Sequence, residues 1–373
     1  MHRCWIEVSR GQIARNFQSV LRATGPDIEV MPVVKADAYR HGMREVAKVL
    51  AGCGARWMGV SSVGEGVTLR EAGITARLLV MADFLPSERE YLFEHDLTPA
   101  LHSLEDIASY HALAKNRGIV APFHLKIDSG MGRLGTRASA LEIVLALSAS
   151  PNTYLEGLMT HFASAADYIS MQTEDQTARF QGISKELEAS GIRPRYTHMS
   201  STIGIAYNRR DAWGNLVRPG HAIYGYVSPA RGEAPERILQ VQPALSWKTR
   251  VLAVKDLPKG AQIGYGGMFR APKPMKIAVL AAGYADGIPH GLGNKGKVLL
   301  HGQYSNILGA VSMDLTTIDV THLEKVETAD VVTLIGRDGP LSIDAQQMAR
   351  MAGVISYSLL CGISARVERI YVE

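Results

Sequence analysis

Short apolar runs alternate with longer amphipathic segments through the first two-thirds of the chain. Eight such runs lie between residues 29 and 225, and most are separated by stretches with the periodicity of surface helices. Apolar runs joined by helical connections are typical of parallel strands that are buried on both faces. We therefore predict strands at residues 30–36, 57–62, 77–82, 97–101, 123–129, 155–162, 195–201 and 216–220.

Eight βα units in succession predict a (β/α)8 barrel. A doubly wound open sheet is the alternative, but no GxGxxG follows the first run. Barrel enzymes carry their functional groups at the C-terminal ends of the strands. Taken singly, each polar residue at these ends is an ordinary strand-end residue, whereas their convergence predicts a site. The residues are Lys35, Lys126, Asp128, His161, Ser201, Thr202, Arg218 and Gly220.

The last third of the chain has a different pattern. From about residue 236 it consists of β-type runs joined by turns that contain glycine, and only residues 342–353 have the pattern of a helix. We predict an α/β barrel domain at residues 1–235 and a mostly β domain at residues 236–373. Residues 1–10 are strand-like and precede the barrel, so we expect them to pair with the second domain.

Composition further limits the classes of function that the chain can have. The 373 residues carry 40 basic and 36 acidic side chains, well interspersed, which gives no basic patch for nucleic acid. Three scattered cysteines and the absence of a CxxC or paired-histidine pattern predict no metal site. No window approaches 18 consecutive apolar residues, and the N-terminus has no signal-peptide pattern. We expect a soluble cytoplasmic protein without a membrane span.

Lys35 ends the first predicted strand, in the segment VVKADAYRHG. A lysine at the end of a core strand is costly unless it has a partner or a chemical task. Burial lowers the pKa of an amine, and a neutral amine forms Schiff bases with carbonyls, including pyridoxal phosphate. Hydroxyls and backbone N–H groups after the seventh and eighth strands suit a phosphate. The candidates there are Ser201, Thr202 and Gly220, with Tyr39 within reach.

Arg218 is informative about such a cofactor. Pyridoxal enzymes often place a carboxylate beside the pyridine nitrogen to keep it protonated. An arginine, with a pKa above about 12, is already fully protonated and cannot accept the proton that a carboxylate would share with this nitrogen. We therefore expect an unprotonated ring nitrogen, a weaker electron sink and little transamination.

Eight segments, in order and across both predicted domains, resemble the alanine racemase family, which consists of pyridoxal-phosphate enzymes of fold type III. One such segment would be weak evidence, whereas eight in register are specific. They read VVKADAYRHG, HLKIDSGMGRLG, THFASA, VRPGHAIYG, IGYGG, GYADG, VSMDLTTIDV and SYSLLCGISARV.

The resemblance implies a two-base racemase that is a homodimer with shared active sites. Lys35 holds the cofactor and is the base on one face of the substrate, and Tyr265 of the partner subunit is the base on the other face. Two opposed bases remove the need for one group to cross the cofactor plane. A tyrosine with an ordinary pKa near 10 is a poor base at pH 7, so it needs cationic help.

The resemblance also assigns the supporting residues. Lys126, as a carbamate, orients Arg133, which contacts the substrate carboxylate. His161 bridges Arg218 to Tyr265. The other implied residues are the cofactor contacts Tyr39, Ser201, Thr202, Arg218, Gly220, His221 and Tyr357 and, from the partner subunit, the Met313 backbone and Asp314.

The chain departs from the family pattern at several positions, none of which removes a catalytic group. Arg40 stands where glycine is usual, and we expect it to face solvent. The others are Ser201-Thr202 in place of Asn-Ser, His221 in place of an aliphatic residue, and Met268-Phe269 in place of a basic residue and an aromatic.

The implied function is the interconversion of L- and D-alanine, which supplies D-alanine for peptidoglycan. A racemase of broader specificity, acting on serine or basic amino acids, is the first alternative. Non-catalytic pyridoxal-binding proteins are single barrels, and the β-rich domain and Tyr265 argue against them. Fold-type-III decarboxylases are usually longer and match these segments less well.

Overall fold

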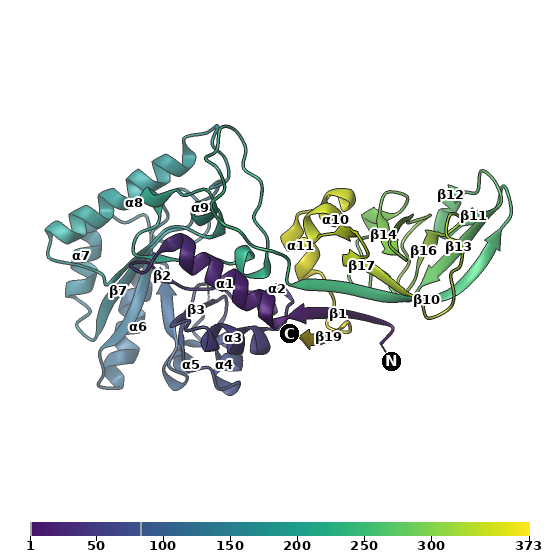
Figure 1. Cartoon of the computed structure of the whole chain (residues 1–373). Helices are drawn as coiled ribbons and strands as arrows, with labels where there is room; N and C mark the ends of the chain where they lie inside the picture. The colour runs from purple at the N-terminus through teal and green to yellow at the C-terminus, as the bar shows by residue number, and fades with distance from the viewer. Residues whose placement is uncertain (1, 83) are drawn as a thin grey trace. The chain divides into compact units, whose positions relative to one another are not determined.

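A computed structural model describes residues 2–82 and 84–373 (Figure 1). The described chain divides into two compact units. We call them the barrel unit, which comprises residues 13–38 and 43–242, and the β unit, which comprises the N-terminal residues through Gln12, residues 39–42 and residues 243–373.

Eight short strands form the barrel unit, and all eight neighbouring pairs of the ring are paired or bridged in parallel. Six of them pair in chain order, from β3 to β8. Parallel bridges join Ser201 to Arg218 and Val33 to Gly59, and β9 pairs with β2, which closes the ring. The prediction of a (β/α)8 barrel is confirmed. The strands are β2 (Glu29–Val30), β3 (Trp57–Val60), β4 (Arg77–Val80), β5 (Thr98–Leu101), β6 (Ala121–Lys126), β7 (Thr153–Met159), β8 (Tyr196–His198) and β9 (Leu216–Val217).

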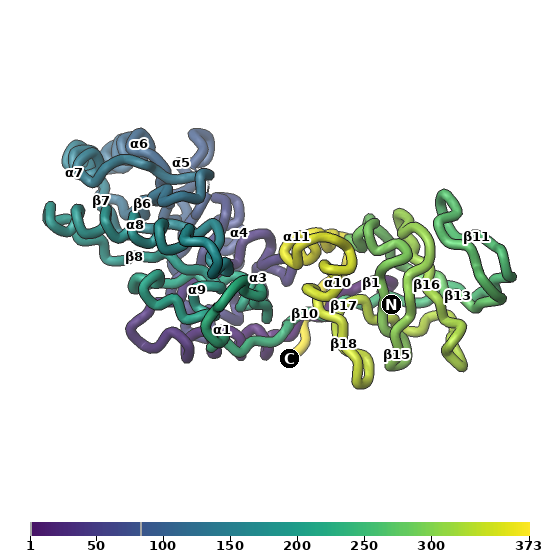
Figure 2. The backbone as a smooth tube through the Cα atoms, turned by 90° about the horizontal axis from the view of Figure 1, so that it is seen from above, coloured from purple at the N-terminus to yellow at the C-terminus, as the bar shows by residue number. Residues whose placement is uncertain are grey.

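Helices lie on the outside of these strands in Figure 1, and α5, α6 and α7 again lie at the outer edge of this unit in Figure 2. Several begin where the sequence provides a serine cap: Ser62, Ser103 and Ser139 each accept a hydrogen bond from an N–H of the first turn. The helices are α1 (Arg10–Thr24), α3 (Met43–Gly52), α4 (Val63–Glu71), α5 (Arg89–Glu94), α6 (Leu104–Asn116), α7 (Ala140–Ser148), α8 (Gln172–Ala189) and the short α9 (Thr202–Ala206).

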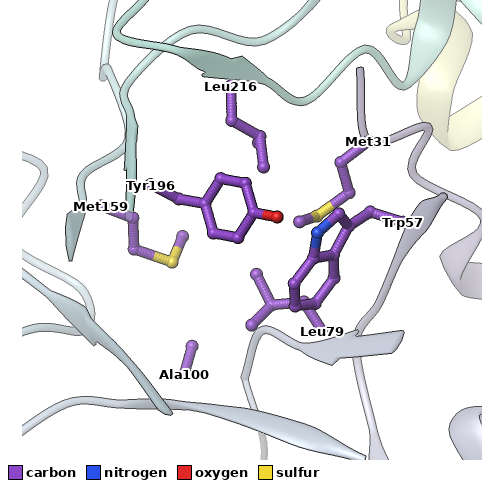
Figure 3. Close-up of a cluster of buried hydrophobic side chains, with 7 residues drawn as sticks. All are labelled: Met31, Trp57, Leu79, Ala100, Met159, Tyr196 and Leu216. Atoms are coloured by element: carbon purple, nitrogen blue, oxygen red, sulfur yellow. The ribbon is translucent and has the colours of Figure 1, made fainter. Parts of the chain in front are cut away.

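The barrel interior is filled with side chains. A cluster of buried residues gathers one side chain from, or directly after, seven of the strands (Figure 3). Its members are Met31, Trp57, Leu79, Ala100, Met159, Tyr196 and Leu216. The barrel is therefore a packed core, and its chemistry is confined to the strand ends and to the few polar side chains that point inward.

The β unit is built on a nine-stranded sheet whose main path runs β15-β14-β17-β10-β1-β19. The N-terminal strand β1 (Cys4–Ser9) pairs antiparallel with β10 (Leu245–Leu257) and parallel with β19 (Glu368–Val372). The other strands are β13 (Met275–Leu280), β14 (Lys297–Leu300), β15 (Gln303–Asn306), β16 (Thr316–Asp319), β17 (Val331–Asp338) and β18 (Leu341–Ile343), with the separate pair β11 (Gln262–Ile263) and β12 (Phe269–Arg270).

Two helices complete the β unit. Helix α10 (Ala345–Ala352) begins at a capping box in which Asp344 and Gln347 bind each other's backbone N–H groups, and it ends at Gly353 with a φ of 71°. Helix α11 (Ser356–Cys361) follows. Among the described residues, no helix has the length and apolar character required to span a membrane.

Candidate active site

The backbone after Lys35 is unusual. Ala36, Asp37 and Ala38 have φ values of 53° to 55°, so the chain makes a left-handed turn without glycine. Such residues cost roughly 1–2 kcal/mol each relative to ordinary backbone. The turn is held by Glu65 in α4, whose carboxylate accepts hydrogen bonds from the N–H groups of Ala36 (2.6 Å) and Ser61 (2.7 Å). Strain that surrounding contacts maintain in this way is typical of functional sites.

Residues 39–42 of the same segment belong to the β unit. The Tyr39 side chain is buried, and its ring lies 6.1 Å from that of Tyr357 in α11. Burial, with the nearby Tyr357 and Cys361, raises the pKa of Tyr39, so its hydroxyl remains a hydrogen-bond donor. The two tyrosines predicted to contact a phosphate are therefore neighbours.

The expectation that Arg40 faces solvent is wrong. Its Nε donates to the carbonyl oxygen of Cys361 (3.3 Å), the last residue of α11, and its own carbonyl accepts from Arg369 Nε (3.0 Å). A guanidinium at a helix C-terminus satisfies an otherwise unused carbonyl and interacts favourably with the helix dipole. Arg40 thus binds the end of the helix that carries Tyr357.

Four cationic groups converge at the C-terminal rim of the barrel. Burial, followed by the charges of Arg218, Lys126, Arg133 and Lys35, lowers the pKa of His161 to about 3. Burial, followed by Arg133, Arg218 and Lys35, lowers the pKa of Lys126 to about 8. These groups are close enough to repel one another, so the rim favours an anionic ligand, and His161 within it is neutral at pH 7.

The loop after β6 carries Arg133, which is exposed in the single chain. The Asp128 carboxylate organises this loop: it accepts hydrogen bonds from the N–H groups of Gly130 (3.1 Å) and Gly132 (2.9 Å) and from Arg137 Nε (2.8 Å). Gly135, with a φ of 113°, lies so close to the strand that a Cβ would approach the Asp128 nitrogen to 2.8 Å. The loop can therefore fold back on β6 only with glycine at this position.

Arg218 is buried and uses its two terminal nitrogens fully. Nη1 donates to the Nδ1 and carbonyl oxygen of His198, both at 2.8 Å. Nη2 donates to the carbonyl oxygens of Thr160 (2.5 Å) and Met199 (2.9 Å). A guanidinium has five N–H donors, so Nε–H is the one for which the described residues provide no acceptor. Burial lowers the pKa of Arg218 to about 9, which leaves it charged at pH 7.

The predicted phosphate residues lie next to this arginine. The Thr202 hydroxyl accepts hydrogen bonds from the N–H groups of Gly220 (3.2 Å) and Ala222 (3.1 Å), which leaves its hydrogen available to a ligand. Ser201 precedes α9 and makes no side-chain capping bond to it. His221 is buried, and its ring stacks on Tyr226 at 5.0 Å, so this departure from the family pattern is accommodated in the interior.

The other predicted site residues are in the β unit. Tyr265 is 78% exposed and lies in a one-turn helix, Tyr265–Gly267, between Gly264 and Gly266, both with a φ of 69°. Met313 is 54% exposed, and its carbonyl accepts from the Ala285 N–H (3.0 Å). Asp314 Oδ1 accepts from Arg366 (2.8 Å). Large, solvent-exposed side chains such as Tyr265 and Met313 are typical of a surface that meets another molecule.

Two family models match the chain almost end to end. Residues 8–229 match the alanine racemase N-terminal domain, and residues 244–371 match the alanine racemase C-terminal domain. The chain belongs to the alanine racemase family. The resemblance found in the sequence is thereby confirmed, and with it the expectation of an amino-acid racemase.

Relatives and solved structures agree with the family. The chain is 39% identical to the alanine racemase of Carboxydothermus hydrogenoformans, with all of both chains covered, and 38% identical to that of Halothermothrix orenii, covering 98% and 96%. The alanine racemase structure from Clostridium difficile 630 has a TM-score of 0.92 at 30% identity, covering 100% and 96%. That from Bacillus anthracis, with bound L-Ala-P, has a TM-score of 0.90 at 32% identity with the same coverage.

Several positioning residues of this racemase were missed in the sequence. Glu65 lies within a surface helix and resembles any solvated glutamate. Gln176 of α8 is buried, and it binds the His161 carbonyl (3.1 Å) and the Ala163 N–H (2.9 Å). His124 begins the motif HLKIDSGMGRLG and His198 lies in the predicted strand 195–201, and strand alternation places His124 on the same face as Lys126. That alternation was the one available signal.

Proposed function

We propose that this chain interconverts L-alanine and D-alanine with pyridoxal 5'-phosphate as its cofactor, and supplies D-alanine for peptidoglycan in the cytoplasm. The observation that carries the proposal is the barrel rim. It combines Lys35 on a strained turn, a cluster of cations, and an arginine with one N–H donor left, in a chain of the alanine racemase family.

The donor set at the rim fits that cofactor. An amine for its aldehyde is provided by Lys35, and Arg218 Nε–H is suited to donate to its ring nitrogen. The phosphate would be held by the hydroxyls of Ser201 and Thr202 and the backbone of Gly220 and His221, with Tyr39 and Tyr357 from the β unit. When bound, pyridoxal phosphate supplies an electron sink that makes the Cα–H of an amino acid acidic. Because Arg218 keeps its protons, it would leave the ring nitrogen unprotonated, which would limit the sink and disfavour transamination.

Proton transfer at Cα needs a base on each face of the substrate. Lys35 is the base on one face, and Tyr265 of the partner subunit is the base on the other. His161 has a pKa of about 3, so it is neutral at pH 7 and can serve as a hydrogen-bond bridge between Arg218 and the partner's Tyr265 without adding charge.

Arg133 binds the substrate carboxylate, and Lys126 orients it. With a pKa lowered to about 8, Lys126 has a neutral fraction at pH 7 that can react with carbon dioxide to form a carbamate. A carbamate carries a negative charge, which would pair with Arg133 and reduce the repulsion among the four cations.

A homodimer with shared active sites is the assembly we propose. The exposure of Tyr265 and Met313 in the single chain supports it, because a base that is 78% exposed has no dry environment of its own. In the dimer, Tyr265, the Met313 backbone and Asp314 of one subunit would complete the site of the other.

The test is turnover of a panel of L-amino acids by the purified, cofactor-loaded protein, read by chiral chromatography. We expect D-alanine to form much faster than D-serine or the basic D-amino acids. Comparable rates for serine or arginine would replace the alanine proposal by the broader racemase, for which the Met268-Phe269 departure is the motivating observation.

Lys35→Ala provides the control for the same experiment. It should abolish both racemisation and the visible absorbance of the bound cofactor. A visible band that persists in Lys35→Ala would show that another lysine holds the cofactor.

A further inference from the structure

A histidine occupies a place in the apolar core of the barrel. Seven strands contribute to the cluster in Figure 3, and β6 is the one that does not. Its inward residue at this level is His124, which is fully buried, with its ring 5.4 Å from that of Trp57 and 6.0 Å from that of Tyr196. A polar ring at such a position is costly unless both nitrogens have suitable partners.

The neighbouring strand is shaped around this ring. Phe123 pairs with Leu155 but His124 pairs with Gly157, so Glu156 is an extra residue in a bulge of β7. A Cβ on Gly157 would lie 2.4 Å from His124 Nδ1, so glycine is what leaves room for the imidazole. The bulge places a carboxylate beside the histidine, because Glu156 Oε2 lies 3.8 Å from His124 Nε2.

His124 belongs to a continuous polar chain through the barrel. Its Nδ1 lies 2.8 Å from Nε2 of His198, and Nδ1 of His198 lies 2.8 Å from Nη1 of Arg218 at the rim. At the other end, Arg77 binds Glu156 with both terminal nitrogens, at 2.5 and 2.7 Å, and lies 4.1 Å over the Trp57 ring. Arg77 begins β4, so the chain runs from the C-terminal rim to the opposite end of the strands.

The protons of this chain can be assigned. An arginine only donates, so His198 Nδ1 is an acceptor. Burial lowers the pKa of both histidines, so each is neutral and carries one proton. His198 therefore has its proton on Nε2 and donates to His124 Nδ1. The proton of His124 is then on Nε2, which faces Glu156 Oε2 at 3.8 Å, beyond hydrogen-bond distance, so the carboxylate acts on this N–H through its charge.

We propose that His124 and Glu156 are positioning residues that act through His198 to orient Arg218, so that its Nε–H is the donor presented to the cofactor ring nitrogen. This inference rests on the proposed function. The carboxylate at one end of the chain and the guanidinium at the other favour the same tautomer of both imidazoles, in which His198 Nδ1 accepts from Arg218 Nη1. With the four hydrogens of Nη1 and Nη2 engaged, the guanidinium plane has one orientation.

Nitrogen NMR of protein labelled with 15N-histidine tests the assignment in the wild-type holoenzyme. We expect two buried histidines in the neutral Nε2–H form, unchanged between pH 5.5 and 9. A neutral Nδ1–H form, or a protonated ring, for either His124 or His198 would overturn the proposal. This measurement needs no substitution, so it does not depend on the folding of a variant.

Substitutions test the consequence for the cofactor. His124→Phe keeps a ring without nitrogens, and Glu156→Gln keeps the shape of the carboxylate without its charge. Each should weaken cofactor binding and lower kcat by roughly 10- to 100-fold. Each should also shift the visible absorbance of the cofactor and, in protein loaded with 15N-labelled cofactor, the resonance of the pyridine nitrogen. Tyr196→Phe removes a hydroxyl from the same core cluster outside the polar chain. It should leave cofactor affinity and kcat within about 2-fold of the wild type and the two spectra unchanged.

The outcomes separate the two proposals. If the wild-type protein does not racemise alanine, the proposed function fails whatever the variants do. If it does, and both His124→Phe and Glu156→Gln retain the wild-type cofactor affinity and ring-nitrogen resonance, the positioning role is wrong while the racemase remains. If His124→Phe fails to fold, Glu156→Gln and the wild-type tautomers decide the question.

Discussion

At the scale of single residues, the site consists of side chains whose chemistry is set by what surrounds them. Lys126 and His161 are ordinary residue types, yet burial beside neighbouring cations lowers the pKa of the first to about 8 and of the second to about 3. Arg218 has one N–H donor left because four backbone and histidine acceptors engage the rest. The functional property in each case belongs to the environment and not to the residue type.

Tyr265→Phe removes one hydroxyl from an exposed turn. If this hydroxyl is the second base, kcat for alanine should fall by roughly 10²- to 10⁴-fold in both directions, while the visible absorbance of the bound cofactor stays unchanged. Steady-state kinetics and an absorbance spectrum measure the two effects. Full turnover in Tyr265→Phe would eliminate the two-base assignment.

Glu65→Gln tests the support of Lys35. The two carboxylate oxygens each accept one hydrogen bond, from the N–H groups of Ala36 and Ser61. An amide has only one acceptor oxygen, so its NH2 group would face the second backbone N–H, and both groups are donors. We expect the turn to be destabilised by about 1–3 kcal/mol, with weaker cofactor binding measured by absorbance titration. Glu71→Gln, at the exposed end of the same helix, is the control and should bind like the wild type. Equal affinities would show that the turn holds itself.

At the scale of elements, loops at the rim are fixed by contacts with the strands beneath them. Thr136 exchanges backbone hydrogen bonds with Lys126 and Asp128, and Asp128 gathers the loop between them. The loop that carries Arg133 is therefore an ordered extension of β6, and hydrogen bonds to the end of that strand fix its position.

Gly135→Ala should displace this loop. The new Cβ would meet the Asp128 nitrogen at 2.8 Å and the Lys126 carbonyl oxygen at 2.9 Å, at a φ that side chains rarely adopt. We expect KM for alanine to rise roughly 10-fold or more, because Arg133 is misplaced by a fraction of an ångström or more. Gly118→Ala is the matched control, since Gly118 also has a positive φ but has open space around its Cβ position. Similar KM values for both variants would contradict the role of the loop.

At the scale of the whole molecule, the two units bring different parts of the predicted site. The barrel unit carries Lys35, Arg133 and Arg218, and the β unit carries Tyr265 and Tyr357. In the proposed homodimer, activity would depend on both subunits, whereas stability depends on groups buried within each unit.

Mixing Lys35→Ala with Tyr265→Phe tests the shared site. Each homodimer lacks one base at both of its sites, whereas a mixed dimer has one intact site and one doubly altered site. After subunit exchange at equal concentrations, about a quarter of the wild-type activity should appear. Co-expression with two affinity tags provides the mixed dimer directly. No recovery in a purified mixed dimer would place Lys35 and Tyr265 of a working site in one chain.

Acid should destabilise the fold. Burial lowers the pKa of His124, His161 and His198 in the folded state, whereas their ordinary value is near 6.5 in the unfolded chain. Below pH 6.5 the unfolded chain therefore binds more protons, and the free energy of unfolding falls by up to roughly 1.4 kcal/mol per pH unit for each histidine. Burial raises the pKa of Glu156, but His124 and Arg77 outweigh it and hold it at about 2, which adds a further loss below about pH 4.5.

Urea unfolding of the cofactor-free protein at pH 7.5 and 5.5 measures this loss. His161→Asn should reduce the difference between the two conditions, and the exposed His290→Gln should leave it unchanged. A wild-type stability that is equal at both values would show that the buried histidines are not neutral.

The sequence alone determined the fold class and the family, and it predicted most of the residues that we propose to touch the cofactor. This was possible because the pattern of a strand or a motif is contained in a short stretch of the sequence. Lys35, Arg218 and Tyr265 lie inside such stretches. What only the tertiary structure decided is which residues act on those groups. Glu65 reaches a turn 29 residues away, and Glu156 becomes an inward residue through a one-residue bulge. Arg40 binds a helix end 321 residues further on. These contacts join positions that are distant in the chain, and no local pattern of apolar and polar residues encodes them.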